Sequence, residues 1–535
     1  MTRRRWGILI ASALVVLVVI IIVFISISPR TPSLAGNPQT TSTVGAGGGT
    51  PGTASNLSLV GQSSLYQRGM NAALAIYQQY VYIGNRTDGS STCGNGDSRG
   101  PGNVCPHPHP GVLIVSAADP AHPNIVGEIG PPFEGNVGIT SRELRVWPQQ
   151  KLLIVMNFRC SAVLHACPQG TDAVFPFDLK FFDLSDPVHP RFIKSYVPTS
   201  KAGRPLLPHE MFLWTDPHNA NRALLYLSTP TLSVNTNVPN LLIADISRVA
   251  TGGPITEVAE GNWNNRFPQA NNPANYNYNL IVHSMGVTAD GNRAYLAMEA
   301  GEFLVLDTSD VAKDVANPQL RLLTDPANRP LWGNPAPCSN TCPNGHSAVQ
   351  VPGRPFALTT DEVYGTATDR SFGCPWGWVH MISLTDPAHP KIVGQYNIAQ
   401  DQPSFCSSQA NDALTEQFTS YSSHNPTVLP DLAFVSWHSG GLQAIDISNP
   451  DRPTQAGWYS PTPLPQVANE DPALGGGPNK VQVWSYPIIS NGLIYVVDIR
   501  NGLYILRYTG PHADEVSKIH FLEGNSNLGD ALTLG

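Results

Sequence analysis

The sequence predicts an all-β protein, a seven-bladed β-propeller, on three grounds: its composition, a repeated strand motif and a segment that closes the ring. The 535 residues include 47 glycines and 49 prolines, and only 13% of the residues are charged. This composition is typical of a chain with many strands and turns. The net charge is -8, and no cluster of Lys or Arg lies beyond the first five residues, so we expect no nucleic-acid partner.

The repeated motif is a short apolar strand that runs into a polar turn, which is bounded by proline in several copies. Clear copies are GVLIVSAADPAHP, which begins at 111, and GLQAIDISNPDRP, which begins at 441. An apolar strand pair precedes each copy and a short strand follows it, so that one repeat supplies four antiparallel strands. Seven repeats of this kind predict a seven-bladed propeller. The copies begin near residues 111, 178, 240, 302, 378, 441 and 502.

The seventh repeat supplies only three strands, the last at about 502–508. The missing fourth strand has a counterpart near the other end of the chain, where LSLVGQS at 57–63 matches the fourth strand IVGQY at 392–396. We therefore expect residues 57–63 to complete the last blade, because a propeller is stable when its ring has no open edge.

The N-terminus predicts a membrane anchor. Arg3, Arg4 and Arg5 precede an uncharged apolar run from Gly7 to Ser28. As a helix this run would be about 33 Å long, enough to cross a bilayer. The arginines favour a cytoplasmic start, which places the rest of the chain on the extracytoplasmic side of the membrane. A cleaved signal peptide is the alternative.

The chain thus divides into four expected segments of a single-pass membrane protein, which we expect to be monomeric. They are a cytoplasmic stub and transmembrane signal anchor at 1–28, a flexible linker at 29–55, the propeller at 56–510 and a C-terminal tail at 511–535.

Eight cysteines lie in the part of the chain that we expect to be exported, where disulfides form. Spacing does not fix their connectivity. Pairing between sequence neighbours is our prediction, and a Cys-x3-Cys-x3-His metal site that ends at His346 is the alternative for one pair. The predicted disulfides are Cys93–Cys105, Cys160–Cys167, Cys338–Cys342 and Cys374–Cys406.

Four histidines open the predicted innermost strands of blades 3 to 6, and Arg142 aligns with them in blade 2. Innermost strands line the central channel, so these side chains should converge near its upper mouth, the end that carries the long inserts. Neutral imidazole is the commonest ligand of copper, zinc, iron and nickel, so a metal site is one interpretation, with copper first and zinc second. The other is that the histidines only form hydrogen bonds at strand ends. Arg142 suits an anion or another ligand. The four histidines are His209, His283, His346 and His424.

Other polar residues predict structural roles. We expect His438 to lie in a hairpin turn and His109 in an exposed proline-rich loop. Aspartates that recur at one strand position should form turn and ladder hydrogen bonds rather than catalyse a reaction. These are Asp183, Asp245, Asp307 and Asp446.

The motif of three apolar residues followed by Asp, Ile or Leu, Ser, Asp, Pro and a second Pro resembles the LVIVD repeat of bacterial exported propeller proteins. Residues 61–85 and 434–450 are similar to that family's opening and penultimate-blade segments. The resemblance covers about 57–510 and implies the fold without a specific activity. A distant resemblance to selenium-binding proteins and methanethiol oxidases implies copper held by channel histidines.

We therefore expect a membrane-anchored surface module that is not an enzyme. Its upper face would bind another envelope protein, a glycan or a small ligand. The alternative is a copper-dependent, or other metal-dependent, oxidoreductase similar to methanethiol oxidase, and a third reading is a purely structural envelope protein. The sequence contains no nucleophile elbow, P-loop or dinucleotide fingerprint.

Overall fold

The fold below is that of the unit Thr41–Gly535. Within the described residues no helix is both long and apolar enough to span a membrane. The expected anchor at 1–28 lies outside them. The computed structural model describes residues 42–86, 109, 111–130, 140–158, 178–231, 237–263, 266, 282–298, 302–327, 344–362, 377–406, 420–468 and 479–535.

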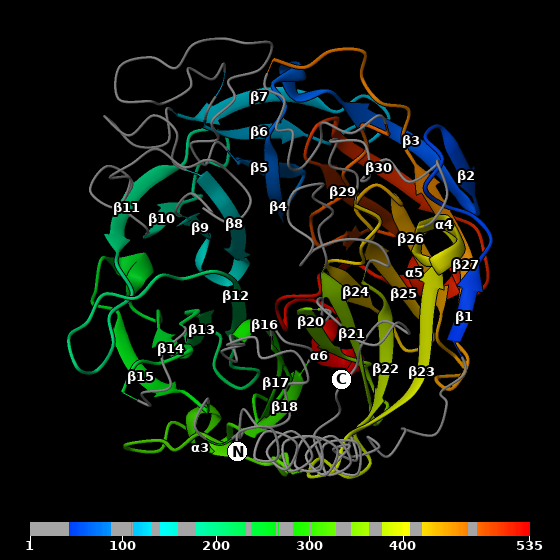
Figure 1. Cartoon of the computed structure of the whole chain (residues 1–535). Coiled ribbons are helices and arrows are strands. Elements are labelled where there is room, and N and C mark those ends of the chain that lie inside the picture. Colours follow the sequence, from blue (N-terminus) through cyan, green and yellow to red (C-terminus); the bar gives the residue numbers. More distant parts are fainter. Residues whose placement is uncertain are drawn as a thin grey trace, which may run out of the picture. The chain divides into compact units, whose positions relative to one another are not determined.

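The described residues form seven sheets, which confirms the predicted propeller. Figure 1 shows these sheets, here numbered blades I to VII, arranged around a common centre. The strands of each blade are given from the innermost outward. Blade I holds β4 (Asn71–Tyr77), β5 (Tyr80–Asn85), β6 (Val112–Ser116) and β7 (Asn124–Ile129), and blade II holds β8 (Thr140–Trp147), β9 (Leu152–Phe158), β10 (Leu179–Asp183) and β11 (Arg191–Tyr196). Blade III holds β12 (Met211–Thr215), β13 (Ala223–Ser228), β14 (Leu241–Asp245) and β15 (Thr256–Gly261), and blade IV holds β16 (Val282–Val287), β17 (Arg293–Met298), β18 (Glu302–Asp307) and β19 (Arg321–Leu322).

The last three blades each gain a fifth strand. Blade V holds β20 (Asn344–Gln350), β21 (Phe356–Glu362), β22 (Val379–Ser383), β23 (Lys391–Ile398) and β1 (Ser42–Gly45). Blade VI holds β24 (Pro426–Val428), β25 (Leu432–Ser436), β26 (Leu442–Asp446), β27 (Thr454–Ser460) and β2 (Thr53–Ser55). Blade VII holds β31 (Phe521–Leu522), β28 (Ile488–Ser490), β29 (Leu493–Asp498), β30 (Gly502–Tyr508) and β3 (Leu57–Ser63). The short helices are η1 (Leu65–Gln67), η2 (Pro148–Gln150), η3 (Val249–Thr251), α3 (Ser309–Ala312), η6 (Ala399–Asp401), α4 (Pro403–Cys406), α5 (Ala513–Lys518) and α6 (Ala531–Leu534).

The core lies between neighbouring blades, which explains why the strands are apolar on both faces. Along β13, Leu224 and Tyr226 pack in a cluster with side chains of blade IV. The alternating residues Leu225 and Leu227 pack in a cluster with blade II. Each face of a strand therefore belongs to a different interface, and burying one such leucine contributes about 1.5–3 kcal/mol.

The ring closes as the sequence predicts. β3 pairs antiparallel with β30, from Leu57 opposite Tyr508 to Ser63 opposite Leu503. The chain segment before blade I therefore supplies a strand of blade VII, so the two ends of the repeat array are held together by backbone hydrogen bonds.

Removing β3 should destabilise the ring. A shortened chain that begins at residue 66 lacks β3, which leaves β30 as an exposed edge, and we expect it to melt at a lower temperature or to aggregate. Thermal unfolding checks this, and a chain that begins at residue 56 is the matched control because it loses β1 and β2 but keeps β3. Equal melting temperatures for the two chains would contradict the role given to β3.

The segment expected as a linker contributes strands to the ring. β1 runs parallel to β23 at the outer edge of blade V, and β2 runs antiparallel to β27 at the outer edge of blade VI. Residues 42–55 have few apolar side chains, but a strand added to a sheet edge is held by its backbone. The expectation of a flexible linker up to residue 55 is therefore wrong for residues 42–55.

The segment expected as a tail, 511–535, packs against the ring. β31 pairs with β28, the innermost strand of blade VII. A Cβ atom at Gly524 would lie 1.9 Å from the carbonyl oxygen of Pro426, so this close crossing of blade VI requires glycine. The Asn527 side chain exchanges hydrogen bonds of 2.7 Å with the backbone of Thr215 in blade III. This segment thus links several blades, and α6 lies near the inner strands in Figure 1.

The recurring aspartates have the predicted turn role. In each copy a carboxylate oxygen accepts the backbone N–H two residues later, which forms an Asx turn at the end of the third strand. The accepted N–H groups belong to Ser185, Ser247, Ser309 and Ser448, at 2.7–2.9 Å. The predicted disulfides lie outside the described residues, apart from the backbone of Cys406 at the end of α4.

Candidate functional site

Five histidines from four blades meet one carboxylate at the centre of the ring. Four of these histidines lie at or just before innermost strands, and the fifth lies in the hairpin between β25 and β26. The carboxylate ends β21, the second strand of blade V. The group, here called the His–Glu362 cluster, consists of His209, His283, His346, His424, His438 and Glu362.

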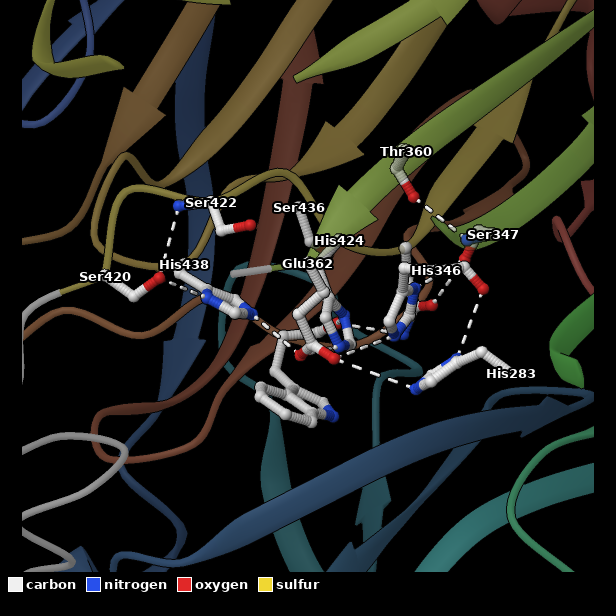
Figure 2. A network of polar contacts seen from close by, with 12 residues as sticks. His283, His346, Ser347, Thr360, Glu362, Ser420, Ser422, His424, Ser436 and His438 are labelled. Carbon is white, nitrogen blue, oxygen red and sulfur yellow. Dashed lines mark hydrogen bonds and ion pairs between the residues drawn. The ribbon is translucent and has the colours of Figure 1, made fainter. Parts of the chain in front are cut away.

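Glu362 lies within contact distance of four imidazoles, as Figure 2 shows. Its Oε1 atom is 3.0 Å from Nε2 of His424 and 3.5 Å from Nε2 of His438. Its Oε2 atom is 3.7 Å from Nε2 of both His283 and His346. The fifth imidazole joins through His283, since the Nε2 atoms of His209 and His283 are 2.8 Å apart.

The second nitrogen of each imidazole that approaches Glu362 is held by the surrounding protein. Nδ1 of His283 contacts the carbonyl oxygen of His346 at 3.2 Å, and Nδ1 of His424 contacts that of Trp484 at 2.8 Å. A carbonyl only accepts, so Nδ1 carries the hydrogen and the neutral ring turns a lone pair on Nε2 toward Glu362. Hydroxyl groups hold the other two Nδ1 atoms, Ser347 at 2.8 Å for His346 and Ser420 at 3.1 Å for His438.

Burial sets the protonation of the cluster. Glu362 is 6% exposed and the imidazoles of His346, His424 and His438 are fully buried. Burial lowers the pKa of His283 to about 4 and that of His424 to about 3, so both are neutral at pH 7. Burial raises the pKa of Glu362, but attraction to the surrounding histidines in their protonated form outweighs burial, so that this pKa lies well below its usual value.

These distances fit ligands that share a metal ion. Two ligand atoms that each lie about 2.0–2.1 Å from one ion are about 2.9 Å apart at a right angle and about 3.4 Å apart at the tetrahedral angle. The distance of 3.0 Å from Glu362 to Nε2 of His424 lies within this range, and the other three, at 3.5–3.7 Å, exceed it by about 0.3 Å or less. Nε2 lone pairs that face a carboxylate need a cation between them, and holding Nδ1 by a carbonyl is typical of metal-bound histidine. The donor set therefore fits a transition-metal ion.

Two arginines lie beside the cluster. The guanidinium carbon of Arg86 is 4.0 Å from the ring centre of Trp484, and that of Arg142 is 5.8 Å from it. The same indole stacks on His438, with ring centres 5.2 Å apart and an angle of 3° between the planes. Trp484 thus contacts both an arginine and an imidazole of the cluster.

Two further buried carboxyl groups face these arginines. Burial raises the pKa of Glu143, and it raises the pKa of Glu210 well above its usual value, with the Glu143 charge adding to the effect. An ion pair of 3.1 Å joins Glu143 to Arg145. This side of the centre therefore holds groups able to exchange protons close to His209.

The sequence located some members of the cluster and missed others. The structure brings together His209, His283, His346 and His424 and puts Arg142 nearby; a metal role for them stays a prediction. The turn role expected for His438 is incomplete. It does occupy a hairpin, with a left-handed φ of 38°, but its ring faces Glu362.

Glu362 itself was missed. Glu362 is the last residue of β21, the second strand of blade V, and it lies opposite Asn344, the first residue of β20. This pairing brings Glu362 level with His346. The adjacent acidic residues Asp361 and Glu362, between a strand and a long insert, were the available signal. Of the other candidates, His109 pairs with Glu128 at 3.0 Å outside the cluster, and Cys338 and Cys342 lie outside the described residues.

Comparison with known proteins found one repeat-family match and several solved structures of low similarity. The family model of the LVIVD repeat matches residues 283–315 and 427–460, in blades IV and VI. No curated protein sequence matches this chain. The periplasmic gluconolactonase PpgL of Pseudomonas aeruginosa is a distantly similar solved structure, with 11% identity and a TM-score of 0.40 over 75% of this chain and 86% of that chain. The β-propeller domain of Cps50 (Swd1) from Myceliophteria thermophila is another, with 11% identity and a TM-score of 0.43 over 85% of this chain and 100% of that chain.

The described residues define a seven-bladed β-propeller, two segments of which match the LVIVD repeat model. None of these matches shows the distant resemblance to selenium-binding proteins and methanethiol oxidases, which stays a prediction.

Proposed function

We propose that this propeller is a metal-dependent enzyme that holds a transition-metal ion in the His–Glu362 cluster. The observation that carries the proposal is the approach of four buried imidazoles to the two oxygens of one carboxylate, at 3.0–3.7 Å. Burying so many polar groups without a central cation would leave Nε2 lone pairs facing a negative charge, which is costly in a site of low dielectric constant.

Copper is the first expected metal, because imidazole-rich sites suit it. Zinc is the second, and the carboxylate ligand also suits iron, since two histidines with one carboxylate bind both zinc and non-haem iron. A bound copper or iron ion would supply oxidation–reduction chemistry, and zinc would supply an activated water. The protein's part is to orient the imidazoles through Nδ1 and to exclude bulk water.

We propose that the substrate that binds beside the metal is an anion. Arg86 and Arg142 stack near Trp484 on the side of the centre next to His438. Arginine binds carboxylates and other oxyanions through two parallel N–H donors, so these groups suit an anionic substrate drawn to the metal.

We further propose that the enzyme acts outside the cytoplasm, tethered to a membrane. The support is the uncharged run from Gly7 to Ser28 behind three arginines. The alternative is a non-catalytic module that binds a glycan, a small ligand or an envelope protein on the upper face. The LVIVD propeller suits both, and a metal-bound protein without turnover on any tested substrate would favour the module.

Elemental analysis tests the proposal. The purified chain, expressed with copper and zinc supplied, is expected to retain at least one transition-metal ion per chain after dialysis. His424→Ala should lose metal without unfolding, while His512→Ala, a histidine outside the cluster, should keep it. Less than about a tenth of an equivalent in the wild type would end the metal proposal, since a site of this kind should bind tightly.

A further inference from the structure

Glu362 divides the cluster into two halves. Oε1 faces His424 and His438, while Oε2 faces His283 and His346. Figure 2 shows His438 and His283 on opposite sides of this carboxylate. Each oxygen of Glu362 therefore approaches a different pair of imidazoles.

Each half has the ligands of a complete metal site. The ligand atoms of His283, His346 and Glu362 lie within 4.8 Å of one another, and so do those of Glu362, His424 and His438. The two triads share only the carboxylate. Three protein ligands with one open position are the usual set for a catalytic metal ion.

We infer that the His–Glu362 cluster binds two transition-metal ions bridged by Glu362, one held by His283 and His346 and the other by His424 and His438. This inference rests on the proposed function and fixes its stoichiometry. The oxygens of one carboxylate suit a bridge, because paired ions in two-metal sites lie about 3.5–4 Å apart.

The two ions are not equivalent. His209 approaches the first half, with its Nε2 atom 2.8 Å from that of His283, and Glu210 joins the same pair as a third group within 4.8 Å. No such additional histidine accompanies the second half among the described residues. The ion near His283 therefore has more ligands available, and it should be the more tightly held of the two.

Metal stoichiometry and electron paramagnetic resonance test the inference with copper as the probe. The full chain, loaded with Cu(II) and dialysed, is expected to hold about two ions. His346→Ala and His438→Ala should each retain about one ion, because each variant removes a ligand of one half only. Magnetic coupling between neighbouring Cu(II) ions should make the signal per ion weaker in the wild type than in either variant.

The outcomes separate the two proposals. A wild-type chain without copper would overturn the proposed function itself. One ion per chain, lost equally in His346→Ala and His438→Ala, would leave a metal site but overturn the bridged pair. Asp431, His512 and Glu515 form a separate group on the ring. If His512→Ala loses the second ion while His438→Ala keeps it, that ion lies outside the cluster and the inference fails.

Circular dichroism and thermal unfolding of each variant show that it has folded. If His346→Ala is unfolded, His283→Ala replaces it, since both histidines belong to the same half and the expected loss of one ion is the same.

Discussion

Replacing Glu362 by glutamine is expected to weaken metal binding by at least about 100-fold. Loss of a group that only supports a metal ligand costs 10–100-fold in affinity, and Glu362 contacts the ligand atoms themselves. The amide keeps the size and one acceptor oxygen but removes the negative charge, which Glu362 provides among imidazoles that are neutral at pH 7.

Competition with a coloured chelator measures the dissociation constant of copper or zinc for the wild type and for Glu362→Gln. Glu128→Gln is the matched control, because Glu128 also pairs with a histidine but lies outside the cluster. Similar affinities in wild type and Glu362→Gln would show that the carboxylate has no part in metal binding.

Acid should destabilise the metal-free protein through the buried imidazoles. The folded pKa of His283 is about 4, below the ordinary value near 6.5 that it regains on unfolding. Between these values the unfolded chain binds a proton that the folded chain does not, so stability falls as the pH falls from about 6.5 to about 4. Each such group contributes up to about 1.4 kcal/mol per pH unit.

The histidine contribution is measured as a difference, because carboxyl groups with raised pKa values, such as Glu210, act in the opposite direction. Denaturant unfolding in the presence of a chelator at pH 6.5 and 4.5 is the measurement. The loss of stability should be smaller in His283→Ala than in the wild type by about 1–3 kcal/mol. His122→Ala, an exposed histidine, should behave like the wild type. Equal losses in wild type and His283→Ala would contradict the buried neutral imidazole.

The sequence predicted the part of the site that follows the repeat. His209, His283, His346 and His424 occupy one position in successive repeats, so their convergence follows from the symmetry of the ring. Glu362 and His438 break that symmetry. Glu362 depends on the register of β21 against β20, and His438 depends on a hairpin with a left-handed residue. Neither feature has a periodic signature.

The fold shows the same difference between features that follow the repeat, which were predicted, and features that do not, which were missed. Side-chain patterns predicted the seven blades and the closing strand at 57–63, because both bury apolar residues in a repeated order. The strands at 42–45 and 53–55 were not predicted, since they join sheet edges through backbone hydrogen bonds and carry few apolar side chains. Residues 511–535 were missed for a related reason, because buried polar side chains such as Asn527 hold them to backbone atoms of other blades.

The central claim is that the His–Glu362 cluster holds metal, and anomalous X-ray diffraction from crystals of the metal-loaded protein tests it most directly. Data collected on both sides of the absorption edge of copper or zinc locate each ion. We expect anomalous density between Nε2 of His283, His346, His424 and His438 and the oxygens of Glu362, divided into two peaks by the carboxylate. An empty cluster, or density only at surface groups such as that of His512, would contradict the account.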